Sequence, residues 1–105
     1  MANRTLVQLP SNLSVRDISI VHGKLAEVLD QSESISLVVP DDAVSDISFV
    51  QLVEAARVKA EVSGKTIALA SPAKGNLREV LDRCGLLTDA SRNDLQFWLH
   101  EETVQ

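Results

Sequence analysis

The chain has very few of the residues that mark several common classes of protein. Of its 105 residues one is cysteine, none is tyrosine, and aromatic residues make up 3%. A lone cysteine, Cys84, cannot form an internal disulfide, which is typical of proteins in a reducing compartment. So few aromatic side chains also exclude the stacking platforms on which proteins bind single-stranded nucleic acids. These absences favour a cytoplasmic protein.

Excess positive charge and long apolar runs are also lacking. The net charge is −5, so a phosphate backbone would be repelled, and we expect no nucleic-acid partner. No apolar run approaches the roughly 20 residues that span a bilayer. The segment MANRTLVQLP has neither the apolar stretch nor the cleavage site of a secretory signal. We expect no direct insertion into a membrane.

Motifs for cofactors and metals are missing as well. The four glycines are isolated from one another, so there is no glycine-rich loop that could hold a phosphate group. His22 and His100 lie far apart, and no cysteine or carboxylate follows either of them at the spacing of a zinc site. We expect surface or edge positions for both histidines, no cofactor and no metal.

The size and composition predict a single domain over residues 1–105. Hydrophobic residues make up 45% of the chain and no low-complexity tract interrupts it, which is sufficient for a modest core. We place that core at about residues 5–87, with a C-terminal covering segment at 88–105. The tail DLQFWLHEETVQ fits both a strand and a helical period, so it is expected to be a short strand or helix at one edge of the sheet.

Three apolar segments alternate with three helical patterns. The expected strands are TLVQLP (5–10), SISLVVP (34–40) and TIALASP (66–72), and the expected helices cover 15–30, 46–63 and 71–84. Strands that alternate with helices imply right-handed crossovers. The expected fold is therefore α/β, a small mixed but mainly parallel β-sheet whose helices pack mostly on one face.

The helix over 46–63 has the clearest boundaries. Ser45 or Asp46 is expected to cap its start, and Gly64 suits a left-handed stop. Its apolar residues, Phe49 among them, recur at helical spacing on one face. In the next helix, Ser71 and Pro72 are expected to form the cap and the first turn. The apolar stripe of that helix predicts that Cys84 is a core residue.

This order of segments resembles the STAS domain, the module named for sulphate transporters and anti-sigma-factor antagonists. The resemblance covers about Leu6 to Leu87. It rests on ISLVV, then Asp46-Ile47-Ser48-Phe49, then EAARVKAEVSG, KTIALASP and NLREVLDRCGLL. It implies a non-enzymatic regulatory protein that acts by binding other proteins in signal transduction and transcription regulation. The implied partner is a kinase-like anti-sigma factor or a chemotaxis-linked signalling protein.

The resemblance also implies a way to control binding. In such domains a kinase phosphorylates the hydroxyl residue that follows the motif aspartate, and only the unphosphorylated form binds the partner. Here Ile47 occupies that position, and Phe49 stands where a glycine is usual. The phosphoacceptor candidates are therefore Ser48 and Ser45, unless the domain acts without phosphorylation or the motif is shifted by one residue. The expected partner-binding residues are Asp41, Asp42, Asp46, Ile47, Phe49, Gln51, Glu54 and Arg57.

Three other functions are alternatives to this one. The same fold would suit an unphosphorylated subunit of a larger complex, such as a membrane transporter. A phosphotransfer receiver needs a lysine after a late strand, whereas Lys65 precedes its strand. A small enzyme or ligand-binding protein would depend on Cys84 or the aspartates, but no convergent set of polar groups accompanies them. Trp98 is either an interface anchor or a cover for the core, and self-association is left open.

Overall fold

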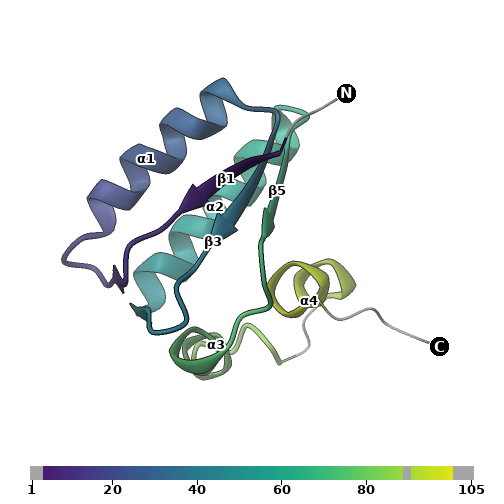
Figure 1. Cartoon of the computed structure of the whole chain (residues 1–105). Helices are drawn as coiled ribbons and strands as arrows, with labels where there is room; N and C mark the ends of the chain where they lie inside the picture. Colours follow the sequence, from purple (N-terminus) through teal and green to yellow (C-terminus); the bar gives the residue numbers. More distant parts are fainter. Residues whose placement is uncertain (1–3, 89–90, 101–105) are drawn as a thin grey trace.

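The computed structural model describes residues 4–88 and 91–100, and its centre is a three-stranded sheet (Figure 1). Strands β1 (Thr5–Gln8), β3 (Ser34–Val38) and β5 (Thr66–Leu69) lie in the order β1-β3-β5. Both neighbouring pairs are parallel. An α/β fold with a mainly parallel sheet is therefore confirmed.

Two long helices connect these strands. Helix α1 (Ile18–Gln31) joins β1 to β3, and α2 (Ile47–Val62) joins the β3 side to β5. Because the strands advance in one direction across the sheet, right-handed crossovers place both helices on the same face. Alternate strand residues such as Leu37 are buried under these helices, whereas Leu6 on the opposite face is exposed. Helices α1 and α2 therefore lie on one face of the sheet, in agreement with the expectation that the helices pack mostly on one face.

Helix α2 begins and ends as its sequence predicts. Asp46 is its N-cap, and Gly64 has a φ of 72°, a conformation in which a side chain would be strained. The buried residues of α2 are Phe49, Val50, Val53, Ala56 and Ala60. Phe49 is completely buried. Its assignment to the partner-binding surface is therefore wrong, and the helical spacing that places it in the core is right.

A second, very small sheet was not expected from the sequence. Strand β2 (Asn12–Leu13) pairs in parallel with β4 (Val44–Ser45). Two residues are too few for a visible alternation of polar and apolar side chains. This pairing brings the chain before α1 against the chain before α2, and it thereby assembles the surface described below.

Helix α3 (Gly75–Arg83) begins later than Ser71 and Pro72 predicted. The backbone N–H of Ala73 donates a hydrogen bond to the carbonyl of Trp98 at 2.7 Å, which holds the segment before α3 out of the helix. The prediction for Cys84 is also wrong. Cys84 follows the last residue of α3 and its side chain is exposed, because the helix ends before the apolar stripe would return to the core.

The C-terminal segment forms helix α4 (Arg92–Leu99), which contacts β5. Trp98 on this helix is completely buried, so it covers the core and is not an exposed interface anchor. Residues 89–90 and 101–105 of the expected covering segment lie outside the described residues. In Figure 1, α3 and α4 lie at the end of the molecule where β5 ends.

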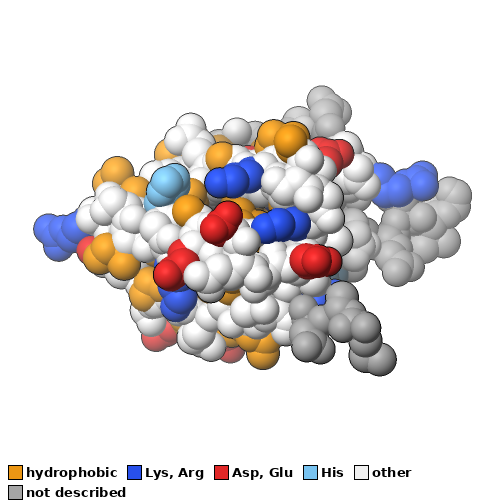
Figure 2. Space-filling view, turned by 90° about the horizontal axis from the view of Figure 1, so that it is seen from above, with side chains coloured by type: hydrophobic (Ala, Val, Ile, Leu, Met, Phe, Trp, Pro, Cys, Tyr) orange, Lys and Arg blue, Asp and Glu red, His pale blue; other side chains and the backbone are white. Residues whose placement is uncertain are grey.

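The surface has no strongly basic face in the view from above. Figure 2 shows Lys and Arg side chains next to Asp and Glu side chains, with hydrophobic ones scattered among them. On that side, the coloured residues form no continuous basic patch of the kind that attracts a nucleic acid. None of the helices within residues 4–88 and 91–100 is both long and apolar enough to cross a bilayer.

Candidate functional site at the start of helix α2

The start of α2 is organised by the carboxylate of Asp46. Its Oδ1 accepts hydrogen bonds from the backbone N–H of Ser48 at 3.0 Å and from the Ser48 hydroxyl. Its Oδ2 accepts the backbone N–H of Val15 at 2.9 Å. Asp46 therefore does two things at once. It caps α2, and it ties the segment between β2 and α1 to the helix start.

These hydrogen bonds also change the acidity of Asp46. The hydroxyl of Ser48 is the largest influence, and together with backbone N–H groups it holds the pKa of Asp46 below its ordinary value of 3.8. Partial burial acts in the opposite direction, because it disfavours the charged form. The carboxylate is consequently ionised at neutral pH and adds negative charge where the helix dipole favours it.

Replacing Asp46 with alanine is expected to lower the free energy of unfolding by about 1–2 kcal/mol at neutral pH, since the cap is lost. The pKa of Asp46 is lower in the folded state, so its charge stabilises the fold above pH 3.8 and this stabilisation disappears as pH falls through the folded pKa. Urea denaturation of both proteins should show the difference shrinking below pH 3.8. Asp46→Asn is the control, since it keeps an oxygen acceptor and does not titrate. A loss of stability that is as large below pH 3.8 as at neutral pH would contradict this role.

The two serine candidates differ in accessibility. Ser45 is buried, and both its backbone N–H and its hydroxyl donate to Oδ1 of Asn76, at 2.6 and 3.0 Å. Ser48 is only half-buried and its hydroxyl points to Asp46. A kinase must reach the hydroxyl, so Ser48 is the better placed of the two. The bond from Ser45 to Asn76 instead fastens α3 to β4.

Three large apolar side chains near this helix start are exposed. Val15, Val44 and Ile47 are 69%, 57% and 50% exposed, although all three are large and apolar. Val15 is held beside Asp46 by its backbone, while Val44 and Ile47 lie within three residues of Asp46 in the chain. Gln51 is exposed one turn further along α2. We call Val15, Val44, Asp46, Ile47, Ser48 and Gln51 the α2-start surface.

A hollow of about 370 Å³ adjoins the α2-start surface on the side of α3. Ser45, Asp46 and Ile47 border it from one side, and Asn76, Val80, Arg83 and Cys84 border it from the other. Arg83 is exposed and adds a positive charge next to the first turn of α2. The hollow is large enough to receive a side chain from another protein.

The aspartates predicted for the partner surface do not converge. Asp41 forms an exposed ion pair with Lys74 at 2.9 Å, and Asp42 accepts a long hydrogen bond of 3.4 Å from the hydroxyl of Ser11. Asp46 is turned to Ser48 and Val15 instead. In the part of the chain that the structure describes, no three His, Cys, Asp or Glu side chains come together as they would around a metal ion.

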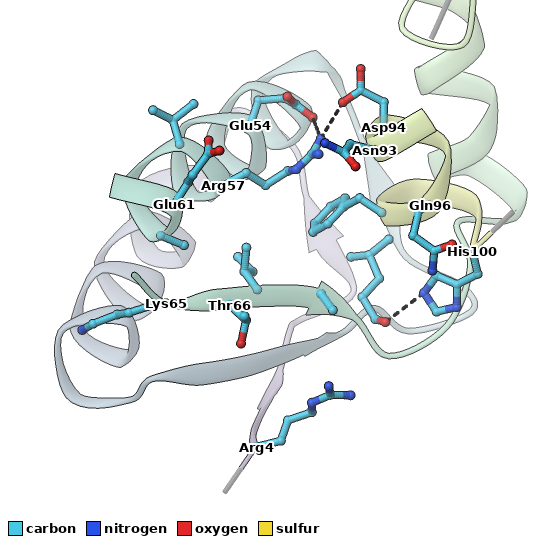
Figure 3. A pocket seen from close by; sticks show the side chains of 16 residues that line it. Arg4, Glu54, Arg57, Glu61, Lys65, Thr66, Asn93, Asp94, Gln96 and His100 are labelled. Carbon is cyan, nitrogen blue, oxygen red and sulfur yellow. Dashed lines mark hydrogen bonds and ion pairs between the residues drawn. The ribbon is translucent and has the colours of Figure 1, made fainter. Parts of the chain in front are cut away.

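Glu54 and Arg57 lie further along α2 and form a polar network with α4 (Figure 3). Nη1 of Arg57 donates to Oε2 of Glu54 at 2.9 Å and to Oδ1 of Asp94 at 3.0 Å. The indole N–H of Trp98 donates to the same Glu54 oxygen at 2.8 Å. The guanidinium also lies 4.4 Å from the centre of the Phe97 ring. Glu54 and Arg57 thus make a structural contact between α2 and α4, and their predicted partner-binding role stays a prediction.

The sequence patterns did not predict three of the residues at this site. Val15 and Val44 belong to the β2 and β4 region, which has no readable periodicity, and Asn76 lies where a helix interior was expected. Compared with known protein families, curated proteins and solved structures, the chain shows no significant match to any of them.

Proposed function

We propose that the protein is a STAS-like regulatory protein that binds a partner protein through the α2-start surface. The observation that carries this proposal is the exposure of three large apolar side chains, Val15, Val44 and Ile47, near the Asp46 carboxylate that also binds the half-buried Ser48. Large apolar side chains that are exposed in one place are typical of protein interfaces. The partner is a kinase-like anti-sigma factor or a chemotaxis-linked signalling protein, and the protein itself catalyses no reaction.

Phosphorylation of Ser48 would control the binding. A phosphate adds nearly two negative charges, and on Ser48 it would replace the hydroxyl hydrogen that now bonds to the Asp46 carboxylate. The resulting repulsion weakens the hold of Asp46 on Val15, so the exposed Val15 is displaced while a charge is added next to Ile47. Both effects oppose docking of an apolar partner surface.

A constitutive adaptor, such as a subunit of a larger complex, is the second candidate. It is favoured by Ile47, which is half exposed. In phosphorylated STAS domains, a residue with a hydroxyl group occupies the corresponding position. An apolar residue there strengthens an interface but cannot accept phosphate. The two candidates use the same surface and differ only in whether Ser48 is modified.

The proposal is tested by affinity purification of the tagged protein from its native cells, followed by mass spectrometry. We expect a partner with a histidine-kinase fold to be recovered, and a separate fraction that carries phosphate on Ser48 and lacks the partner. Phosphate on neither Ser48 nor Ser45, together with a stable partner, would select the constitutive adaptor. Recovery of no partner at all would refute both candidates.

A further inference from the structure

Strand β4 leads into the start of α2, and it is held from two sides. On one side it pairs with β2, and the backbone N–H of Val44 donates to the carbonyl of Ser11 at 2.8 Å. On the other side it meets α3, where Oδ1 of Asn76 accepts two hydrogen bonds from Ser45. Figure 1 shows α3 at the end of the molecule where α2 begins. Because a two-stranded sheet is marginal on its own, the bonds to α3 add a restraint that the small sheet needs.

The bonds between Asn76 and Ser45 are well suited to act as this restraint. Ser45 is 6% exposed, and its backbone N–H and hydroxyl both donate to the same amide oxygen, at 2.6 and 3.0 Å. A buried donor that loses its acceptor is costly, since water cannot replace the bond. Asn76 is in turn held by α3, which is anchored in the core through the buried side chains of Leu77 and Leu81. The position of Ser45 is therefore tied to that of α3.

The restraint on Ser45 reaches the N-cap of α2 through one peptide unit. Asp46 has an extended backbone, with φ −138° and ψ −172°, so it continues the direction of β4. From this position its carboxylate accepts the hydroxyl and backbone N–H of Ser48 and the backbone N–H of Val15. Two oxygens can serve donors on two separate segments only if the backbone of Asp46 is held in place. The contacts thus run from α3 through β4 to the segment before α1.

We propose that Asn76 is a positioning residue for the α2-start surface: by holding Ser45, it keeps the carboxylate of Asp46 within reach of Ser48 and Val15. Asn76 is not one of the residues that form the surface, so it acts through its neighbours. A surface that is ordered before binding loses less conformational entropy when its partner docks. The inference rests on the proposed function, because it explains how the binding surface is preorganised, but its geometry can be tested without any partner.

The test is nuclear magnetic resonance of the purified full chain with the substitution Asn76→Ala. The pKa of the Asp46 carboxyl is expected to rise towards 3.8, because the hydrogen bonds from Ser48 and Val15 that lower it are weakened. Hydrogen exchange at the N–H of Val15 should become about fivefold faster or more. A role in global stability alone would leave the pKa of Asp46 in the folded protein unchanged, so this readout separates positioning from stabilisation.

The matched control is Asn93→Ala. Asn93 is the second residue of α4, as Asn76 is the second residue of α3, but it is exposed and lies on a different helix. Its replacement should leave the pKa of Asp46 unchanged and alter exchange at Val15 less than about twofold. Asn76→Asp retains an oxygen acceptor for Ser45 and should restore slow exchange at Val15. If Asn76→Ala does not fold, Asn76→Ser, whose side chain is too short to reach Ser45 in the same way, takes its place.

Two results would overturn the proposal. The first is an unchanged Asp46 pKa together with unchanged exchange at Val15 in the Asn76 variant, which would show that pairing with β2 is sufficient to hold β4. The second is an equal effect of the Asn93 substitution. Neither result depends on a partner, whereas failure to recover a partner from cells would refute the proposed function and leave these measurements as they are.

Discussion

Replacing Trp98 with alanine is expected to lower the free energy of unfolding by about 3–5 kcal/mol, the usual range for a buried tryptophan. Trp98 is completely buried, and its ring meets that of Phe97 edge to face with centroids 5.0 Å apart. A small domain has about 5–15 kcal/mol of stability in total. The substitution should therefore remove a large part of that total and lower the melting temperature by roughly 15 °C or more.

Part of the stability lost on replacing Trp98 comes from its hydrogen bond, and a second variant measures that part separately. Trp98→Phe keeps most of the apolar volume but removes the indole N–H that donates to Glu54. Arg57 still donates to the same oxygen, so we expect a loss of about 1–2 kcal/mol from this change. Chemical denaturation followed by circular dichroism measures both. A Trp98→Ala protein as stable as the wild type would contradict the assignment of α4 to the core.

Replacing Ile47 with aspartate is expected to weaken binding of the captured partner about 30-fold or more, which corresponds to the loss of a strong interface contact. Ile47 is the exposed apolar residue closest in sequence to Ser48, so the new carboxylate would lose its hydration against the partner. The fold should be preserved, because a negative charge in the first turn of a helix is favourable. The measurement is the dissociation constant by isothermal titration calorimetry.

Val62→Asp serves as the matched control for Ile47→Asp. Val62 is also exposed and apolar, but it is the last residue of α2, at the opposite end from the α2-start surface. Its replacement should leave the affinity for the partner nearly unchanged. If Ile47→Asp binds the partner as tightly as the wild type does, the α2-start surface is not the interface.

Local sequence patterns predicted the long elements well. Strand and helix periods are properties of neighbouring residues, and Asp46 and Gly64 mark the two ends of α2 by their own conformational preferences. Two predictions about α3 were wrong, and only the first error had a cause outside the local sequence. Helix α3 starts late because Ala73 bonds to Trp98, which is distant in the chain, and Cys84 is exposed because the helix ends before it.

The candidate site was predictable only in part. Asp46, Ile47 and Ser48 are contiguous, so the sequence located the helix start directly. Val15 joins them through a backbone hydrogen bond across 31 positions of the chain, which no local pattern reveals. The resemblance to STAS domains placed Phe49 on the surface, although the helical spacing of α2 already placed it in the core. Where the two disagreed, the physical pattern was right.

The most direct test of the central claim is the affinity of the captured partner for two forms of the protein, one unmodified and one phosphorylated on Ser48. The two forms differ only in the phosphate on Ser48, and each is titrated with the partner by calorimetry under the same conditions. The proposed switch predicts tight binding of the unmodified protein and at least a tenfold weaker binding, about 1.4 kcal/mol, after phosphorylation. Equal affinity of the two forms would contradict control through Ser48.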